Sequence, residues 1–261
     1  MTLLRTILAR RPWRREFLAW SMVLGASLLV LVFLVLAREI IEGETHRLDD
    51  AILTALRTPG DPSVLIGPAW LTKVMTDITA LGGVTVLTLI TTLVTLYLVL
   101  ARAERTALFL VVSIVGGWGL SNLLKIGVGR PRPDLVPHLV EVHDLSFPSG
   151  HAMLSAIVYL TLGALLSRLE TRKRLRFFFM ATALVLTLII GLSRIFLGVH
   201  YPTDVIGGWC AGLAWASLTW FAAQRLLGWR TATDRPAEGD PDEGTLGAAD
   251  RMPGHERGSR Q

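Results

Sequence analysis

The chain has 261 residues, of which 51% are hydrophobic and only 18% are charged, and the apolar residues are gathered in long runs. A soluble domain of this size rarely has such a composition, so we expect an integral membrane protein. The formal net charge is +5, but the basic residues lie at the ends of the apolar runs, which favours membrane topology over binding to nucleic acid.

Six apolar runs have the length of membrane-spanning helices, because a span needs about 20 mostly apolar residues. They are residues 17–37, 78–100, 107–124, 152–166, 177–197 and 205–226. The first run follows a basic segment, as a signal peptide does, but it exceeds the roughly 7–15 apolar residues of a signal peptide. We therefore predict an uncleaved anchor and an all-α, six-helix integral membrane bundle.

Lys and Arg residues favour the cytoplasmic side of a membrane and so predict the orientation. With a cytoplasmic N-terminus, fourteen of them lie inside and eight lie outside. The inner set is Arg5, Arg10, Arg11, Arg14, Arg15, Arg102, Arg105, Arg168, Arg172, Lys173, Arg174, Arg176, Arg225 and Arg230; the outer set is Arg38, Arg47, Arg57, Lys73, Lys125, Arg130, Arg132 and Arg194. We predict a multi-pass protein of the cell membrane with both termini in the cytoplasm.

The segments outside the spans have distinct characters. In the longest outer segment, residues 38–77, four apolar side chains share one helical face, which predicts an amphipathic helix lying on the membrane and ending at the Pro/Gly-rich turn 59–62. These four are Leu48, Ile52, Leu53 and Leu56. The predicted organisation is a basic N-terminus (1–16), a six-span domain (17–228) and a tail (229–261) too polar to fold.

Two features of the last span favour structural roles. Cys210 is the only cysteine, so it cannot form an internal disulfide, and no Cys/His group has the spacing of a zinc site. We expect Cys210 to be a small buried hydrophobe. Gly208 and Gly212 form a small-xxx-small pattern that favours close helix packing within one subunit.

The first polar cluster runs from Lys125 to Pro133, after the third predicted span. Its prolines restrict φ and keep the chain extended, so Arg130 and Arg132, two residues apart, are expected to share a side. Converging cations suit a phosphate, because Arg forms a bidentate fork and Lys acts as a point charge. The alternative is a set of snorkelling side chains that meet lipid head groups.

The second cluster, Pro148-Ser149-Gly150-His151, stands at the start of the fourth span. Ser149 is a favoured N-cap, and the free N–H groups of a helix N-terminus form an anion site. Gly150 lets the backbone approach a ligand closely, and His151 would face whatever the helix end binds. A plain N-cap with an incidental histidine is the alternative.

The third cluster joins the fifth and sixth spans and contains Ser193, Arg194, His200 and Asp204. In a helix that begins after His200, Asp204 lies one turn from the imidazole. A carboxylate on one ring nitrogen leaves the other free to attack, which would make His200 a nucleophile, with Arg194 as a further cation. The alternative is a solvated loop with a helix-capping aspartate.

The predicted topology places all three clusters at the outer face of the membrane. Together they resemble the three-part signature of the type 2 phosphatidic acid phosphatase (PAP2) superfamily of membrane lipid phosphatases. The matching residues are Lys125 with Arg132-Pro133, then Pro148-Ser149-Gly150-His151, then Ser193, Arg194, His200 and Asp204. The resemblance covers roughly residues 38–226 and includes every position of the signature.

The resemblance implies hydrolysis of a phosphate monoester or diphosphate of a lipid, without a metal or other cofactor. It implies that His200 attacks phosphorus to form a phosphohistidine, that Asp204 orients it, and that His151 protonates the leaving oxygen and then activates water. Arg130 is expected in a supporting position beside the phosphate-binding residues. These are Lys125, Arg132, Ser149, Gly150 and Arg194.

Other functions stay open at this point. A phosphotransferase would use the same residues to pass the phosphoryl group to another lipid or a sugar instead of water. A transporter or flippase would need charges deep inside the helices or inverted repeats, and the sequence shows neither. The sequence does not distinguish undecaprenyl diphosphate, phosphatidylglycerol phosphate and phosphatidic acid as substrates, and it indicates no oligomeric state.

Overall fold

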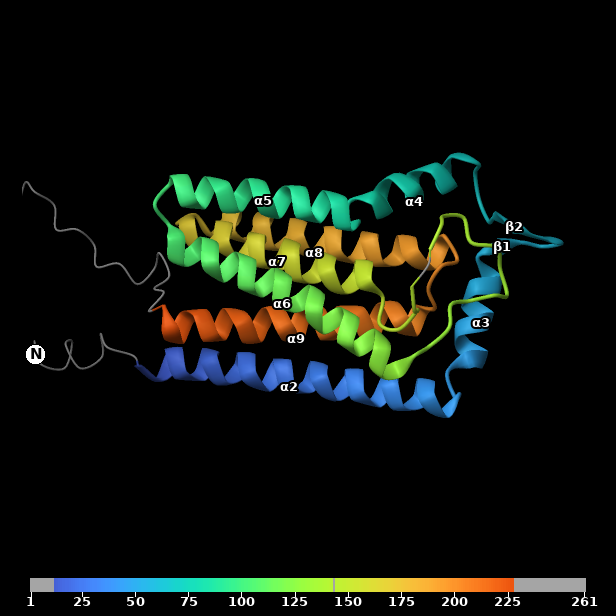
Figure 1. Cartoon of the computed structure of the whole chain (residues 1–261), viewed down its shortest axis with the longest axis horizontal. Coiled ribbons are helices and arrows are strands. Elements are labelled where there is room, and N and C mark those ends of the chain that lie inside the picture. The colour runs from blue at the N-terminus through green and yellow to red at the C-terminus, as the bar shows by residue number, and fades with distance from the viewer. Residues whose placement is uncertain (1–11, 143, 228–261) are drawn as a thin grey trace, which may run out of the picture.

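The chain forms one elongated bundle of helices (Figure 1). The computed structural model describes residues 12–142 and 144–227. The long helices are α2 (Pro12–Glu42), α5 (Val84–Leu100), α6 (Glu104–Val128), α7 (Gly150–Leu169), α8 (Lys173–Phe196) and α9 (Pro202–Leu226). Among the described residues, five helices are long and apolar enough to cross a membrane, and there are six spans if α4 (Trp70–Ala80) and α5, which meet at a 41° bend, count as one. The predicted all-α membrane bundle is confirmed.

Most residues of the two predicted terminal segments lie outside the residues that the structure describes. Helix α2 begins at Pro12, so the last residues of the predicted N-terminal segment 1–16 are helical. Residues 1–11 and the predicted tail 229–261 lie outside the described residues.

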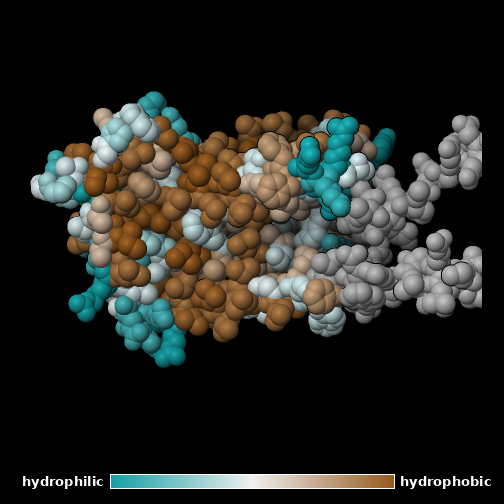
Figure 2. Space-filling view, turned by 180° about the vertical axis from the view of Figure 1, so that it is seen from behind, coloured by the Kyte–Doolittle hydropathy of each residue, from teal (hydrophilic) through white to brown (hydrophobic). Residues whose placement is uncertain are grey.

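Large apolar side chains cover the middle of the bundle, whereas polar side chains gather towards its two ends (Figure 2). Leu24 of α2, Leu93 of α5 and Leu108 of α6 are all more than half exposed. Such exposure is costly in water but not among lipid tails, and the helical backbone satisfies its own hydrogen bonds there. The surface is therefore that of a protein surrounded by a bilayer.

Helix α7 is the centre of the bundle and packs against α5, α6, α8 and α9. Its contact with α9 is close because Gly208 and Gly212 lack side chains. A Cβ at Gly208 would lie 2.7 Å from the carbonyl oxygen of Ser149, and one at Gly212 would lie 2.6 Å from that of Met153. The predicted small-residue packing in the last span is confirmed, and Cys210 is buried as predicted.

The second predicted span is broken where it was expected to be continuous. Helix α4 ends at Ala80 and α5 begins at Val84. A Cβ at Gly82 would lie 2.3 Å from Cγ2 of Ile190 and 3.3 Å from Cδ2 of His151. Only glycine permits this approach, so the break lets the backbone lie directly against α7 and α8.

The predicted amphipathic helix exists as α3 (His46–Ala55), and it lies across the end of the bundle (Figure 1). The prediction that its apolar face lies on the membrane is wrong for Leu53, which is fully buried against residues of α7, α8 and α9. Leu48 is 64% exposed. After α3 the chain forms an antiparallel hairpin of β1 (Arg57–Thr58) and β2 (Asp61–Leu65), which the sequence analysis did not predict.

Candidate active site

Four helix ends meet at the end of the bundle that α3 covers (Figure 1). Helices α6 and α8 end there, and α7 and α9 begin there. This arrangement brings Lys125 near the end of α6, His151 in the first turn of α7, Arg194 near the end of α8 and Asp204 in the first turn of α9 to the same end. The three sequence clusters therefore share one region.

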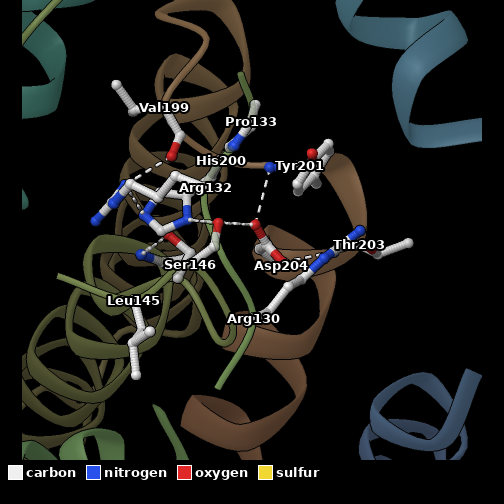
Figure 3. Close-up of polar contacts among 12 residues, drawn as sticks. Arg130, Arg132, Pro133, Leu145, Ser146, Val199, His200, Tyr201, Thr203 and Asp204 are labelled. Carbon is white, nitrogen blue, oxygen red and sulfur yellow. Dashed lines mark hydrogen bonds and ion pairs between the residues drawn. The ribbon is translucent and has the colours of Figure 1, made fainter. Parts of the chain in front are cut away.

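His200 lies in the short connection between α8 and α9 and is 1% exposed. Its Nδ1 atom is 3.5 Å from Oδ2 of Asp204 and 3.3 Å from Oγ of Ser146, which itself donates a hydrogen bond to Asp204 (Figure 3). These acceptors favour a proton on Nδ1. The lone pair then resides on Nε2, which lies 3.2 Å from Nη1 of Arg132.

Asp204 is fully buried, and the start of α9 determines its orientation. Pro202 occupies the first turn, where its missing N–H costs no helical hydrogen bond. The backbone N–H of Tyr201 donates to Oδ2 of Asp204 at 2.9 Å, and Nη1 of Arg130 donates to Oδ1 at 2.7 Å. The carboxylate is thus held from both sides and faces His200.

The pKa of His200 is lowered well below its ordinary value. Burial is the largest cause, followed by the positive charges of Arg132, Arg194 and Lys125, and then by His151. Both effects disfavour the imidazolium, so His200 is neutral at neutral pH, which is the form that can act as a nucleophile.

Lys125 and Arg132 converge on Asp144, a residue outside the three sequence clusters. Nζ of Lys125 donates to Oδ2 of Asp144 and to the carbonyl oxygen of Leu145, both at 2.6 Å. Arg132 donates to the carbonyl oxygen of Asp144 at 2.7 Å and also pairs with its carboxylate. Burial by itself would raise the pKa of Asp144, but the two cations outweigh it and hold that pKa below its ordinary value. A phosphate bound by both cations would have to replace this carboxylate.

Arg194 is 3% exposed and supplies a third cation. Its Nη1 donates to Oγ1 of Thr79 on α4 at 2.9 Å, and its buried Nε has no hydrogen-bond partner in the described part of the chain. The charges of Arg194, Arg132 and Lys125 also act on the half-buried His151. Both histidines therefore lie within the field of the same three cations.

The start of α7 lies beside these cations. Oγ of Ser149 accepts a 3.5 Å hydrogen bond from the N–H of Ala152, as the side chain of an N-cap residue does. The backbone N–H of Ser149 donates to the carbonyl oxygen of Asp204. A Cβ at Gly150 would lie 3.7 Å from Cε of Lys125. The positive end of the helix dipole thus adds to the charge of Lys125.

Arg130 does not lie on the same side as Arg132, where an extended segment would place it. Arg132 contacts the ring nitrogen of His200 that remains free, whereas Arg130 contacts Asp204 on the other side of that pair (Figure 3). The prediction that the two arginines share a side is wrong, because the buried carboxylates attract Arg130 away from Arg132. Four further residues belong to the site or support it and had no sequence signal of their own. They are Asp49, Thr79, Asp144 and Ser146.

Comparison with known proteins places this geometry in a family. The model of the PAP2 superfamily matches residues 106–227. The chain is 34% identical over 189 residues to phosphatidylglycerophosphatase B of Bacillus subtilis, which covers 71% of this chain and 88% of that protein. It is also 34% identical over 134 residues to the lipid A 1-phosphatase of Rhizobium johnstonii, covering 45% of this chain and 50% of the relative.

A solved structure agrees with the sequence comparisons. The transmembrane PAP2 type phosphatidylglycerolphosphate phosphatase from Bacillus subtilis superposes with a TM-score of 0.71 and 32% identity, covering 79% of this chain and 99% of that one. The two chains therefore share one fold. The chain therefore belongs to the PAP2 superfamily and is a membrane lipid phosphatase.

Proposed function

We propose that His200 is the nucleophile of this phosphatase and forms a phosphohistidine, without help from a metal ion. The observation that carries the proposal is the two-sided environment of its imidazole. Nδ1 faces Asp204 and Ser146, while Nε2 faces Arg132. A neutral imidazole held in this way has its lone pair directed towards the cations that would bind a phosphate.

The reaction then proceeds in two steps. Nε2 of His200 attacks phosphorus, and the bond from phosphorus to the lipid oxygen breaks. His151, held in its protonated form by the negative charge of the bound phosphate, gives its proton to that oxygen. In the second step His151 takes a proton from water as the water oxygen attacks the phosphohistidine, which releases phosphate and returns His200 to its neutral form. Asp204 stabilises the positive charge that the ring of His200 carries in between.

Lys125, Arg132 and Arg194 supply the positive charge that the transferring phosphoryl group needs. Phosphoryl transfer depends mainly on positioning and on electrostatic stabilisation, which metal ions provide in many other enzymes. Within residues 12–142 and 144–227, no group of three or more His, Cys, Asp or Glu side chains is arranged to hold a metal ion. Lys125, Arg132 and Arg194 support a metal-independent reaction because they supply that positive charge themselves.

An apolar groove beside the site supports a substrate with a lipid chain. It has a volume of about 620 Å³ and lies between α5, α6 and α7. Leu154 and Val158 line it, and they follow His151 by three and seven residues, so all three lie on one face of α7. A chain in the groove would place its head group at the start of α7. The name of phosphatidylglycerophosphatase B and that of the solved structure, both from Bacillus subtilis, make phosphatidylglycerol phosphate the first candidate, ahead of undecaprenyl diphosphate and phosphatidic acid.

Purified protein is expected to release phosphate from phosphatidylglycerol phosphate faster than from the other two lipids, and equally well in excess EDTA. The three cations bind the phosphate directly, so chelation removes nothing that the reaction needs. Released phosphate is the readout, with a labelled acceptor lipid present to detect transfer. Activity lost in EDTA and restored by a divalent ion would refute metal independence, and label found in the acceptor lipid would identify a phosphotransferase.

We also propose that the site faces the outside of the cell membrane. The opposite end of the bundle carries Arg102, Arg105, Arg172 and Lys173, which favour the cytoplasm. In a Cys210→Ala background, an impermeant maleimide applied to intact cells is expected to label Ser63→Cys in the exposed hairpin. The matched control Arg172→Cys, exposed at the other end, should react only after lysis. The reverse pattern would overturn the orientation.

A further inference from the structure

We propose that Asp49, on the extramembrane helix α3, is a positioning residue for the catalytic histidine. It acts through Arg130 on Asp204, and the inference rests on the nucleophilic role proposed for His200. Asp49 is fully buried, although it belongs to a helix that lies across the end of the bundle. A buried aspartate is rare unless its charge is paired, so its partners indicate its role.

The carboxylate of Asp49 makes three hydrogen bonds, all to residues beside the catalytic pair. Oδ2 accepts from Nη2 of Arg130 at 2.7 Å and from Oγ1 of Thr203 at 2.6 Å. Oδ1 accepts from the backbone N–H of Thr203 at 3.1 Å. Thr203 directly precedes Asp204, whose carboxylate faces His200. By binding Thr203, Asp49 therefore holds the first turn of α9 in place.

Arg130 connects the two carboxylates with one rigid group. Its Nη2 binds Asp49, while its Nη1 donates to Oδ1 of Asp204 at 2.7 Å and to Thr203 at 2.8 Å. The guanidinium also lies 4.0 Å from the centre of the Tyr201 ring, which holds its plane. Because the guanidinium is planar, its position on Asp49 determines how it meets Asp204.

The charges of this cluster make the arrangement sensitive to Asp49. With both acids ionised, two carboxylates share one guanidinium; burial by itself would lower the pKa of Arg130, but Asp204 and Asp49 outweigh it and raise that pKa. If asparagine replaces Asp49, Arg130 is balanced by Asp204 alone and is drawn towards it. Asp204 then turns away from Nδ1 of His200, because Arg130 and the imidazole contact the same small carboxylate.

The docking of α3 itself does not depend on Asp49 alone. Leu53, one turn further along, is fully buried in a cluster with Val205 and Ile195. Asparagine is nearly the same size as aspartate and can still accept from Thr203. Asp49→Asn is therefore expected to fold with α3 in place and to lose mainly the charge that balances Arg130.

Asp49→Asn is expected to lower kcat about tenfold, corresponding to a coupling of about 1.4 kcal/mol, with KM changed less than about twofold. KM is spared because Asp49 touches none of the three phosphate-facing cations. The matched control is Asp50→Asn, the next residue of α3, which lines an open surface pocket and should keep the kcat of the unmodified protein. A kcat equal to that of the control would overturn the inference.

A double-mutant cycle separates positioning from a general structural role. In an Asp204→Asn background the route from Asp49 to His200 is cut, so Asp49→Asn is expected to cause no further loss of kcat. A second tenfold loss in that background would show that Asp49 does not act through Asp204 and would overturn the inference.

Arg130→Lys keeps the positive charge but cannot contact both carboxylates, so it should lower kcat as Asp49→Asn does. Unchanged activity of Arg130→Lys would count against the bridge between the carboxylates. If His200→Ala retains activity the proposed function itself fails, whereas an inactive His200→Ala with a normal Asp49→Asn rejects only the positioning role.

Discussion

Replacing His200 with alanine is expected to lower kcat by at least about 1000-fold, because the variant cannot form the bond to phosphorus. The cations would still bind the phosphate, so the affinity for substrate should change far less than kcat. The ring nitrogens of His200 contact Arg132, Ser146 and Asp204, and alanine has no ring nitrogen that could take the place of Nε2. Phosphate release from a lipid phosphate is the measurement.

The control for this variant is another histidine at the same end of the bundle. Nε2 of His138 lies 2.6 Å from the carbonyl oxygen of Pro133 in the connection between α6 and α7. His138→Ala removes an imidazole of the same chemistry but touches neither Asp204 nor the cations, so its activity should stay close to that of the unmodified protein. Equal activity of His200→Ala and His138→Ala would remove the nucleophile from the mechanism.

Replacing His151 with alanine is expected to give a loss that depends on the leaving group. For a lipid phosphate, whose leaving oxygen needs a proton, the rate should fall by about 100- to 10,000-fold, the usual contribution of a general acid. For an aryl phosphate with a good leaving group the first step no longer needs that proton. The second step still needs His151 to activate water, so labelled phosphate should accumulate on the protein.

The two histidine variants therefore have opposite signatures with the labelled aryl phosphate. His151→Ala should retain acid-labile label on the chain, and the His151→Ala/His200→Ala double variant should retain none. The position of His151 in the first turn of α7, at the end of the bundle where Lys125 and Arg194 also lie, agrees with a group that meets the substrate's oxygens. An equal loss with both classes of substrate, without label on the protein, would assign His151 to binding instead of proton transfer.

Much of the fold was predictable because a membrane imposes a local requirement on the sequence. Each span must supply about 20 apolar residues in a row, which a reader of the chain can find without knowing its neighbours. The break at Gly82 was not found in this way, since both halves of the bent span remain apolar. At the break, Gly82 packs closely against Ile190 and His151. The hydropathy of the sequence carries no information about such contacts between distant residues.

The meeting of His200 and Asp204 was predictable to a similar extent because their motif is short. His200 and Asp204 are four residues apart, so one helical turn brings them together whatever the rest of the chain does. Arg130 shows the limit of that argument. In an extended segment Arg130 would lie on the same side as Arg132. Instead it binds two buried carboxylates, and one of them, Asp49, is 81 residues away in sequence.

By itself, the sequence determined the apolar runs that form the spans and the three polar clusters that meet at one end of the bundle, and it predicted the residues that we propose to attack and to bind a phosphate. Only the tertiary structure decided which buried charges pair. Asp49 meets Thr203 across 154 residues and Arg194 meets Thr79 across 115. A buried charge must find its partner wherever the packed helices bring one within hydrogen-bond distance, and that distance depends on how the side chains of all the helices fill the space between them.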